Sequence, residues 1–302
     1  MKSYNNLPEV SIVITCYNYA RYLPSCLDSV INQTFRDFEI IVVDDGSTDQ
    51  TPVIVKKERY KKLIRYIYQN NRGQANAKNA GINSAKGKYI AFLDADDCWE
   101  PDKLEKQLPL FTRQNVGVVY SRARYIDSFG HDLDLKLSLK YLQPRRGRVT
   151  DYLIMDNFIP FSSSVIRRDC LDRFGAFNEL YRMGIDWDLW LRISTEYEFD
   201  YVDLPLLMYR IGHAGQMSKN VEERQRCSDR IMKNFAQSFP TYIKKNVLRK
   251  ALAYTFSNRG DYQSKRNIPK ALRYYLRSFL YWPLTLEPMK RASKALLKKI
   301  IY

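Results

Sequence analysis

Residues 10–15 have the sequence VSIVIT, a run of mainly β-branched residues that ends at a polar one. Such a run is typical of a strand buried in a parallel sheet. Similar runs recur along the chain, with helical patterns between them. We expect further strands at residues 38–43, 63–68 and 88–93, and helices at 22–32, after 49 and at 73–84. This alternation predicts right-handed βαβ units and therefore an α/β, Rossmann-like fold with a mostly parallel sheet flanked by helices.

The second half of the chain is less regular. Regularity fades at residues 117–160, where polar and basic side chains alternate with apolar ones. Strands are expected at 162–167, 199–202 and 206–210, and a helix opens at Asp186. Strand signals end near Gly215, and the remaining residues predict helices at about 221–238, 243–258, 268–281 and 288–301.

Polar residues follow three of the predicted strands. They are residues 15–18 (TCYN), the pair Asp44 and Asp45, and the acidic stretch 94–97 (DADD). Ligands of parallel sheets bind at the carboxyl ends of the strands, so we expect these residues to line one site. The chain has neither a glycine-rich dinucleotide motif nor a phosphate-binding loop that would explain them otherwise.

The acidic stretch DADD places three carboxylates within four residues, where they repel one another. A divalent cation would neutralise this charge, and oxygen ligands suit Mg²⁺ or Mn²⁺. The alternative is a solvated acidic turn in which Asp96 or Asp97 caps the helix after Pro101. The second acidic pair, Asp44 and Asp45, at another strand end favours the cation site.

Short motifs run in order along about two thirds of the chain. They are TCYN (15–18), QTF (33–35), VVDDGSTD (42–49), NRGQ (71–74), AKNAG (77–81), GKYIAFLDADD (87–97), GIDWDLWLR (184–192) and Tyr209-Arg210. In this order the chain resembles glycosyltransferase family 2. The resemblance implies a GT-A fold and transfer, with inversion, of a sugar from a nucleoside diphosphate sugar, a UDP-sugar or another, to a polysaccharide or lipid-linked acceptor.

The resemblance also implies roles for single residues. The implied donor-binding residues are Thr15, Tyr17 and Asp45 at the nucleobase, Asp94 at the ribose, and Lys78; the implied ligands of Mn²⁺ or Mg²⁺ are Asp96, Asp97 and His213. Asp186 falls on the general base, which must lie within hydrogen-bond reach of the acceptor hydroxyl. Alternatives remain: Asp186 and Asp188 as acids that only stabilise a helix N-terminus, and His213 as a structural loop residue.

Two departures from the family pattern bear on function. Ile185 stands where the family usually has a Glu before the base, and Lys78 stands where it usually has an Arg, so a bidentate contact becomes a point charge. A catalytically silent nucleotide-sugar-binding or membrane-scaffold protein is therefore an alternative. A nucleotidyltransferase, which would release pyrophosphate, is another.

The net charge of +16 is concentrated near the end of the chain, because residues 241–302 hold fifteen Lys and Arg against two acids. We expect a catalytic domain at residues 1–215 and a basic helical extension at 216–302.

In the helix expected at 268–281, Lys270, Arg273 and Arg277 share one face. Ala271, Leu272, Tyr275, Leu276 and Phe279 form the other. Basic amphipathic helices suit an anionic membrane surface. Alternatives are helices that only pack on each other and on the catalytic domain, or a tetratricopeptide-like hairpin that binds a protein. Nucleic acid is disfavoured because no known nucleic-acid-binding module occurs.

Composition excludes several other classes of protein. The chain is 45% hydrophobic and 27% charged, as expected of a globular protein rather than a disordered one. Five scattered cysteines without a CxxC pair, and two histidines, indicate reduced thiols and no zinc site. Residues 1–6 lack the apolar core of a signal peptide, and no apolar run reaches the roughly 20 residues of a membrane span. We therefore expect a cytoplasmic enzyme, peripheral at the inner face of the plasma membrane; an oligomer is compatible with the sequence.

Overall fold

The computed structural model describes residues 7–134, 143–213, 215–216 and 220–301. The contacts within the chain divide it into two units. One unit comprises Met1–Val149 and Phe158–Ile231, and the other comprises Thr150–Asn157 and Met232–Tyr302. The division into a catalytic domain and a basic extension concerns function, and it stays a prediction.

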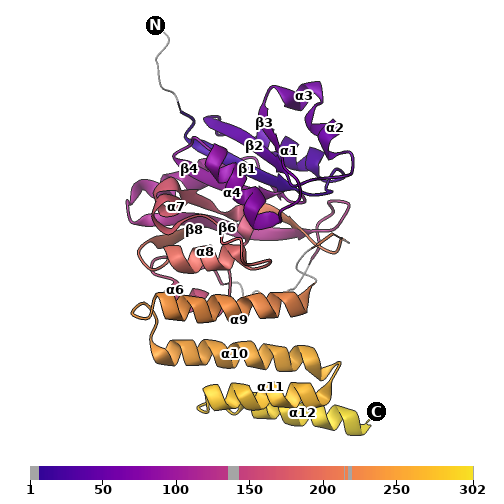
Figure 1. Cartoon of the computed structure of the whole chain (residues 1–302), viewed down its shortest axis with the longest axis vertical. Coiled ribbons are helices and arrows are strands. Elements are labelled where there is room, and N and C mark those ends of the chain that lie inside the picture. Colours follow the sequence, from indigo (N-terminus) through magenta and orange to yellow (C-terminus); the bar gives the residue numbers. More distant parts are fainter. Residues whose placement is uncertain (1–6, 135–142, 214, 217–219, 302) are drawn as a thin grey trace. The chain divides into compact units, whose positions relative to one another are not determined.

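The described residues of the first unit form an eight-stranded sheet (Figure 1). Its strands are β1 (Val10–Cys16), β2 (Phe38–Asp44), β3 (Ile64–Tyr68), β4 (Tyr89–Asp94), β5 (Cys98–Trp99), β6 (Val116–Ile126), β7 (Val165–Arg167) and β8 (Glu198–Arg210). In the order β3-β2-β1-β4-β7-β6-β8-β5, the first four strands are parallel, and β7 runs antiparallel to β4 and β6. β6 and β8 are parallel, and β5 is antiparallel to β8. The predicted α/β fold is confirmed.

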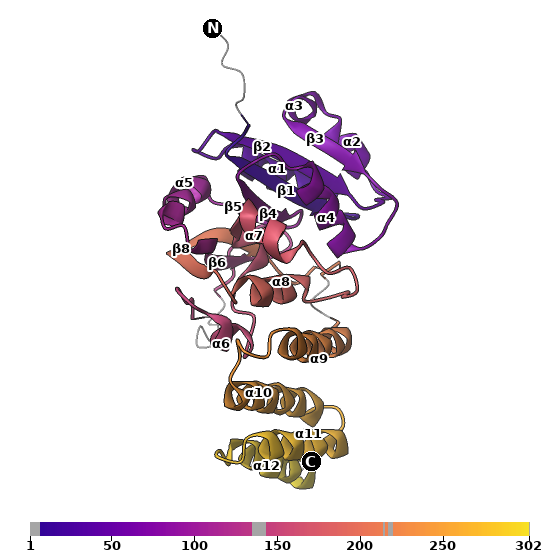
Figure 2. The same ribbon diagram turned by 60° about the vertical axis from the view of Figure 1, so that its left-hand side comes forward.

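Helices cover both faces of this sheet (Figure 2). They are α1 (Leu23–Ile31), α2 (Thr51–Val55), α3 (Glu58–Lys61), α4 (Gln74–Ser84), α5 (Lys103–Gln107), α7 (Arg168–Phe174) and α8 (Ile185–Ile193), with 3₁₀ turns at Leu108–Thr112 and Phe161–Ser163. Successive strand residues point to opposite faces. Accordingly Ile12 and Ile14 of β1 share a core cluster with Leu27 of α1. Val13 faces α4 so closely that a Cβ at Gly81 would lie 2.3 Å from its Cγ1.

The register of the central strands brings the polar strand ends together. Thr15 on β1 is the partner of Asp94 on β4, and Cys16 is the partner of Asp44 on β2. All three strands are parallel, so their carboxyl ends lie at one edge. The predicted convergence of these residues is therefore a consequence of the strand pairing.

Where the sequence pattern fades, at 117–160, the structure has the eleven-residue strand β6, which begins at Val116 and which the sequence analysis did not predict. Its first half is buried, but residues 122–125 are half-buried and include two arginines, which obscured the strand pattern. The strands expected at 199–202 and 206–210 are one strand, β8, which pairs with β6 through several register shifts. The strand expected from 162 begins at Val165, after the 3₁₀ turn.

The second unit is helical in its described residues. It contains α6 (Thr150–Leu153), the last part of α9 (Val221–Ser238), α10 (Lys245–Ser264), α11 (Ile268–Tyr281) and α12 (Glu287–Ile301). Consecutive helices α10, α11 and α12 lie side by side (Figures 1 and 2). α10 and α11 approach closely at Gly260, where a Cβ would lie only 2.4 Å from Cε1 of Tyr275.

Within the described part of the chain, no helix combines the length and the apolar character that a bilayer span requires. Residues 1–6, for which the sequence predicted no signal peptide, lie outside the described residues.

Candidate active site

The first group of predicted site residues is a buried ion pair with a hydroxyl beside it. Lys78 projects from α4 and is only 3% exposed. Its Nζ lies 2.6 Å from Oδ1 of Asp94 and donates to Oγ1 of Thr15 at 3.0 Å. Lys78 therefore neutralises one carboxylate of the acidic stretch and ties α4 to the ends of β1 and β4.

Asp45, predicted at the nucleobase, holds the segment that precedes α4. Its Oδ1 accepts from Nε2 of Gln69 at 2.7 Å and from the backbone N–H of Arg72 at 2.9 Å, and its Oδ2 accepts from the N–H of Gly73 at 2.9 Å. Gly73 has φ +88°, a conformation that favours glycine. The side chain of Tyr17 is exposed near the same strand ends. Asp45 thus shapes the loop that leads into α4.

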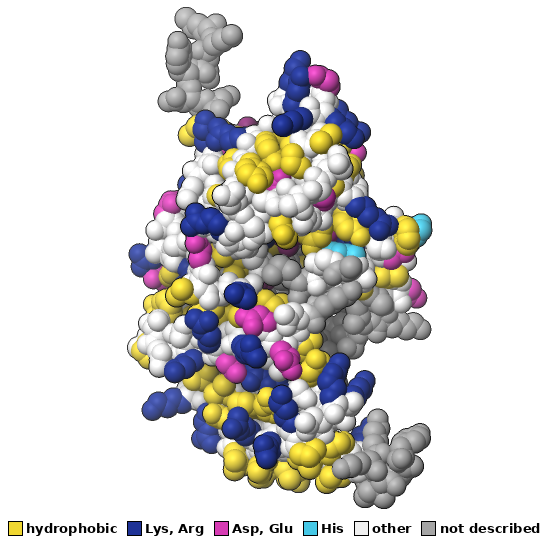
Figure 3. Space-filling model, turned by 45° about the vertical axis from the view of Figure 1, so that its right-hand side comes forward, with side chains coloured by type: hydrophobic (Ala, Val, Ile, Leu, Met, Phe, Trp, Pro, Cys, Tyr) yellow, Lys and Arg dark blue, Asp and Glu magenta, His cyan; other side chains and the backbone are white. Residues whose placement is uncertain are grey.

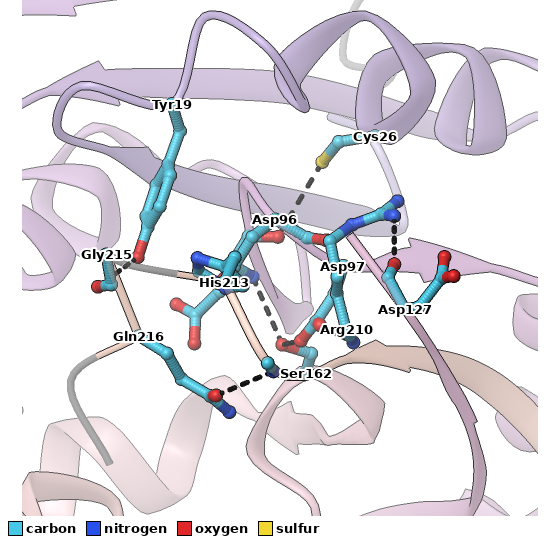
Figure 4. Close-up of polar contacts among 12 residues, drawn as sticks. Tyr19, Cys26, Asp96, Asp97, Asp127, Ser162, Arg210, His213, Gly215 and Gln216 are labelled. Atoms are coloured by element: carbon cyan, nitrogen blue, oxygen red, sulfur yellow. Dashed lines mark hydrogen bonds and ion pairs between the residues drawn. The ribbon is translucent and has the colours of Figure 1, made fainter. Parts of the chain in front are cut away.

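Asp97 points into the protein (Figure 4). Its Oδ2 accepts from the Ser162 hydroxyl at 2.6 Å, and its Oδ1 accepts from the backbone N–H of Arg210 at 2.9 Å. Burial, and then the charges of Asp96 and Asp94, raise the pKa of Asp97 well above its ordinary value. The alternative that Asp96 or Asp97 caps the next helix is wrong, since α5 has Asp102 at its N-cap. The contacts of Asp97 are those of a residue that positions its neighbours.

Asp96 faces His213, although 117 residues separate them (Figure 4). Oδ2 of Asp96 lies 2.9 Å from Nε2 of His213. The imidazole is 5% exposed and packs against the rings of Tyr19 and Tyr22, at centroid distances of 5.7 and 5.2 Å. The Tyr19 hydroxyl donates to the carbonyl of Gly215, and burial followed by the charge of Asp96 raises the pKa of Tyr19. Two predicted metal-binding residues are therefore in contact.

Arg210 and Ser162 are site residues to which the sequence analysis gave no role. Arg210 is 4% exposed; its Nε donates to the carbonyl of Asp96 at 2.7 Å, and an Nη donates to the carbonyl of Asp127 at 2.8 Å. Ser162 holds Asp97 from the 3₁₀ turn before β7. Arg210 stood in a quoted motif, which was a usable signal. Ser162 had none, because 65 residues separate it from Asp97.

The predicted base, Asp186, is half-buried in the first turn of α8, whose N-cap, Gly184, has φ +71°. Ile185, which replaces the usual Glu, is 2% exposed. Asp188 pairs with Arg192 at 2.9 Å, and Arg192 also donates to carbonyls of residues 174–176. Asp188 is therefore held in a structural ion pair, and Asp186 is the acid of this turn that we retain as the candidate base.

α4 also contacts the segment before α8. Gln74 donates to the carbonyl of Arg182 at 2.7 Å, and the amides of Asn76 and Asn79 each donate to the Glu179 carboxylate at 3.0 Å. The same helix carries Lys78 on its buried side. α4 therefore contacts both the segment that leads to Asp186 and, through Lys78, the ends of β1 and β4.

The residues present fit a divalent cation that is only partly held by protein. In the described regions, no three His, Cys, Asp or Glu side chains form a group that could hold a metal by themselves. Asp96 and His213 offer one carboxylate and one imidazole, with Oδ2 of Asp96 2.9 Å from Nε2 of His213. Mg²⁺ commonly takes one or two carboxylates and completes its shell with substrate phosphates and water. Such a shared shell is compatible with this pair.

Two solved structures have folds similar to that of this chain. The structure of S. aureus TarS 1–349 in complex with UDP-GlcNAc matches with a TM-score of 0.68 at 19% identity, covering 90% of this chain and 81% of that one. A mannosyltransferase from Pyrobaculum calidifontis, in complex with GDP-Man and Mn²⁺, matches with a TM-score of 0.64 at 19% identity, covering 98% and 88%. The fold is GT-A, as expected.

The sequence comparison establishes the family. Residues 11–175, more than half of the chain, match glycosyl transferase family 2. Chondroitin synthase of Pasteurella multocida (strain Pm70) is 31% identical over 278 residues, 89% of this chain and 28% of that protein. An uncharacterized glycosyltransferase of Rickettsia prowazekii is 34% identical over 200 residues, 64% of this chain and 62% of that protein. The chain belongs to glycosyltransferase family 2, and it spans less than two thirds of the length of these relatives.

Proposed function

We propose that this protein transfers a sugar from a nucleoside diphosphate sugar to a hydroxyl group of a glycan or lipid-linked acceptor, with residues 1–215 as the catalytic domain. The observation that carries the proposal is the contact between Asp96 and His213, beside the network of Lys78, Thr15 and Asp94, in a chain of this family. Relatives named chondroitin and hyaluronan synthase support a polysaccharide acceptor.

The donor is proposed to bind across the ends of β1, β2 and β4. Tyr17, just after β1, has an exposed ring, and Asp45, just after β2, orders the loop before α4; both are proposed to bind the nucleobase. Asp94, which is partly exposed and pairs with Lys78, is proposed to bind the ribose. A UDP-sugar is the proposed donor, supported by the UDP-GlcNAc complex of a protein with this fold. A hexosyl or N-acetylhexosaminyl group is the sugar that we propose is transferred.

Asp96 and His213 would hold Mn²⁺ or Mg²⁺ together with the diphosphate. When bound, the ion supplies positive charge to the departing diphosphate. Arg210 keeps the Asp96 backbone in place through its 2.7 Å hydrogen bond, and Asp97 fixes the Arg210 backbone in turn. These buried residues act by orientation: they hold the Asp96 carboxylate toward His213.

Asp186 is the proposed general base. It removes the proton of the acceptor hydroxyl as that oxygen attacks the anomeric carbon from the face opposite the leaving diphosphate. One base and no carboxylate nucleophile correspond to a single displacement, with inversion. The Ile185 side chain is a buried hydrocarbon, so Asp186 acts without a carboxylate at the preceding position.

The test compares Asp186→Asn with the control Asp172→Asn, which changes an exposed acid on α7. A panel of nucleotide-sugars is supplied with Mn²⁺ and candidate glycan acceptors, and release of the nucleoside diphosphate is measured. We expect Asp186→Asn to reduce release by about 10²–10⁴-fold and the control to leave it unchanged. Wild-type rates in Asp186→Asn would refute the assigned base.

Binding is measured separately from transfer. A ligand at about 100 times its Kd stabilises the folded state by about 2.7 kcal/mol. UDP with Mn²⁺ should therefore raise the melting temperature of the wild type and of Asp186→Asn, and should do so less in Asp96→Asn. Binding without transfer to any acceptor would favour the catalytically silent alternative, and pyrophosphate as the product would indicate a nucleotidyltransferase.

A further inference from the structure

The helices of the second unit leave a row of leucines exposed. Ala271, Tyr275 and Ser278 form the buried side of α11, and the Ser278 hydroxyl donates to the carbonyl of Ala253 at 2.6 Å. On the other side Leu276 is 52% exposed and Leu280 is 64% exposed. Of the residues predicted to form the apolar face of this helix, Ala271 and Tyr275 are buried and Leu276 is exposed.

Two arginines lie among these leucines. Arg273, Leu276, Arg277 and Leu280 are spaced three and four residues apart, which places them on one helical face. Leu284, just beyond the helix, is 81% exposed. We call these five residues the basic–apolar face.

α12 adds a similar strip. Its small residues Ala292 and Ala295 are buried in a cluster with Ala271 and Tyr275 of α11. Met289 and Leu296, three and four residues from Ala292 and therefore at the edge of this buried side, are 39% and 43% exposed, and Leu286, just before the helix, is 62% exposed. Lys290 and Lys294 are exposed on the next face of the helix. Figure 3 shows hydrophobic side chains gathered over α11 and α12 with Lys and Arg side chains next to them.

Few acids offset this charge. Residues 267–286 contain no Asp or Glu. The two acids of residues 241–302 both pair with one residue: Arg291 lies 2.5 Å from Asp261 and 3.3 Å from Glu287. A surface that combines exposed leucines with Arg and Lys is complementary to one that is anionic at its surface and apolar beneath.

We propose that the basic–apolar face and the adjoining strip of α12 dock on an anionic lipid surface, with the leucines inserted among the acyl chains and the cations at the phosphates. The cytoplasmic leaflet of the plasma membrane has such a surface. The leucines distinguish this partner from a nucleic acid, whose exterior offers phosphates but no apolar layer. Docking would hold the enzyme where a lipid-linked acceptor lies.

Vesicle flotation of the full chain tests the proposal. The probes are vesicles of phosphatidylcholine alone and of phosphatidylcholine mixed with phosphatidylglycerol. We expect flotation with the anionic vesicles only, decreasing as salt is raised. Arg273→Gln combined with Arg277→Gln should weaken partitioning about 25-fold, since each cation near the surface contributes about fivefold. Leu280→Gln combined with Leu284→Gln should weaken it about 100-fold.

Matched controls change equally exposed residues of the first unit. Leu180→Gln replaces a leucine that is 73% exposed, and Lys56→Gln with Lys57→Gln removes two exposed cations. Both controls should float as the wild type does. Equal binding to neutral and anionic vesicles, unchanged flotation of the leucine variant, or no flotation of the wild type would each overturn the proposal. So would self-association without vesicle binding, which would assign the face to a second copy of the chain.

Discussion

Replacing Ser162 with Ala should destabilise the protein more than the same change two residues later at Ser164. Both serines are fully buried, and the substitution removes one oxygen from each. The Ser162 hydroxyl donates to the Asp97 carboxylate at 2.6 Å, whereas the Ser164 hydroxyl donates to the carbonyl of Phe161 at 2.7 Å. Ser162→Ala therefore removes a hydrogen bond to a carboxylate and the 3.2 Å hydrogen bond that Oγ accepts from the Asp94 N–H, whereas Ser164→Ala removes one hydrogen bond to a neutral carbonyl.

The expected magnitudes follow from the acceptors. A hydrogen bond to a charged group contributes about 1.5–3 kcal/mol, and one between neutral groups about 0.5–1.5 kcal/mol. We therefore expect Ser162→Ala to lower the free energy of unfolding by about 2–3 kcal/mol and Ser164→Ala by about 1 kcal/mol. Because burial raises the pKa of Asp97, urea unfolding of both variants is measured with a chelator present and at a pH at which this carboxyl group is ionised.

The same variants test whether Asp97 positions Asp96. Asp97 also holds the Arg210 backbone, and the Arg210 guanidinium holds the Asp96 carbonyl. Loss of the Ser162 hydroxyl should therefore reduce the thermal stabilisation by UDP and Mn²⁺, whereas Ser164→Ala should leave it unchanged. Equal losses of stability in the two variants, with equal responses to UDP and Mn²⁺, would refute the reasoning.

Three further predictions concern buried groups. Lys78→Met removes the ammonium group beside the partly exposed Asp94 and should lower the free energy of unfolding in urea by about 1–3 kcal/mol. An unchanged free energy of unfolding would contradict the role given to this ion pair. Among the described residues, Nζ of the buried Lys103 has no hydrogen-bond partner. Burial also lowers the pKa of Lys103 well below 10.5. Lys103→Met should therefore stabilise the fold by about 1–3 kcal/mol near neutral pH. With this lowered pKa, the unfolded state binds more protons than the folded state, so the wild type gains stability as the pH rises toward 10.5. The extra stability of Lys103→Met should therefore shrink over the same range. A difference in stability that does not change with pH would contradict this prediction. Gly260→Ala would place a Cβ 2.4 Å from the buried Tyr275 ring. It should lower the melting temperature of the helical unit by an amount equivalent to about 1–3 kcal/mol. An unchanged melting temperature would show that the helices can move apart.

The sequence alone determined the elements whose residues form simple local patterns. The apolar runs of β1, β2 and β4 were recognisable because parallel strands buried on both faces are almost continuously apolar. The bounds of α9 and α11 were predicted to the residue. β6 was missed because its second half carries arginines that pair with acids of other segments: Arg122 with Asp203, and Arg124 with Glu100 and Asp132. Such pairing cannot be seen in a local window.

The candidate site likewise has parts that the sequence predicted and parts that only the tertiary structure revealed. The acidic stretch and the motif around Asp186 were visible because they are contiguous in the chain. Only the tertiary structure decided that Asp96 faces His213 and that Asp97 faces Ser162, because the parallel and antiparallel pairing of distant strands brings those side chains together. Likewise the sequence determined that the final helices are basic and amphipathic. Which leucines remain exposed depended on how α10, α11 and α12 pack, since each helix buries only the side that meets a neighbour.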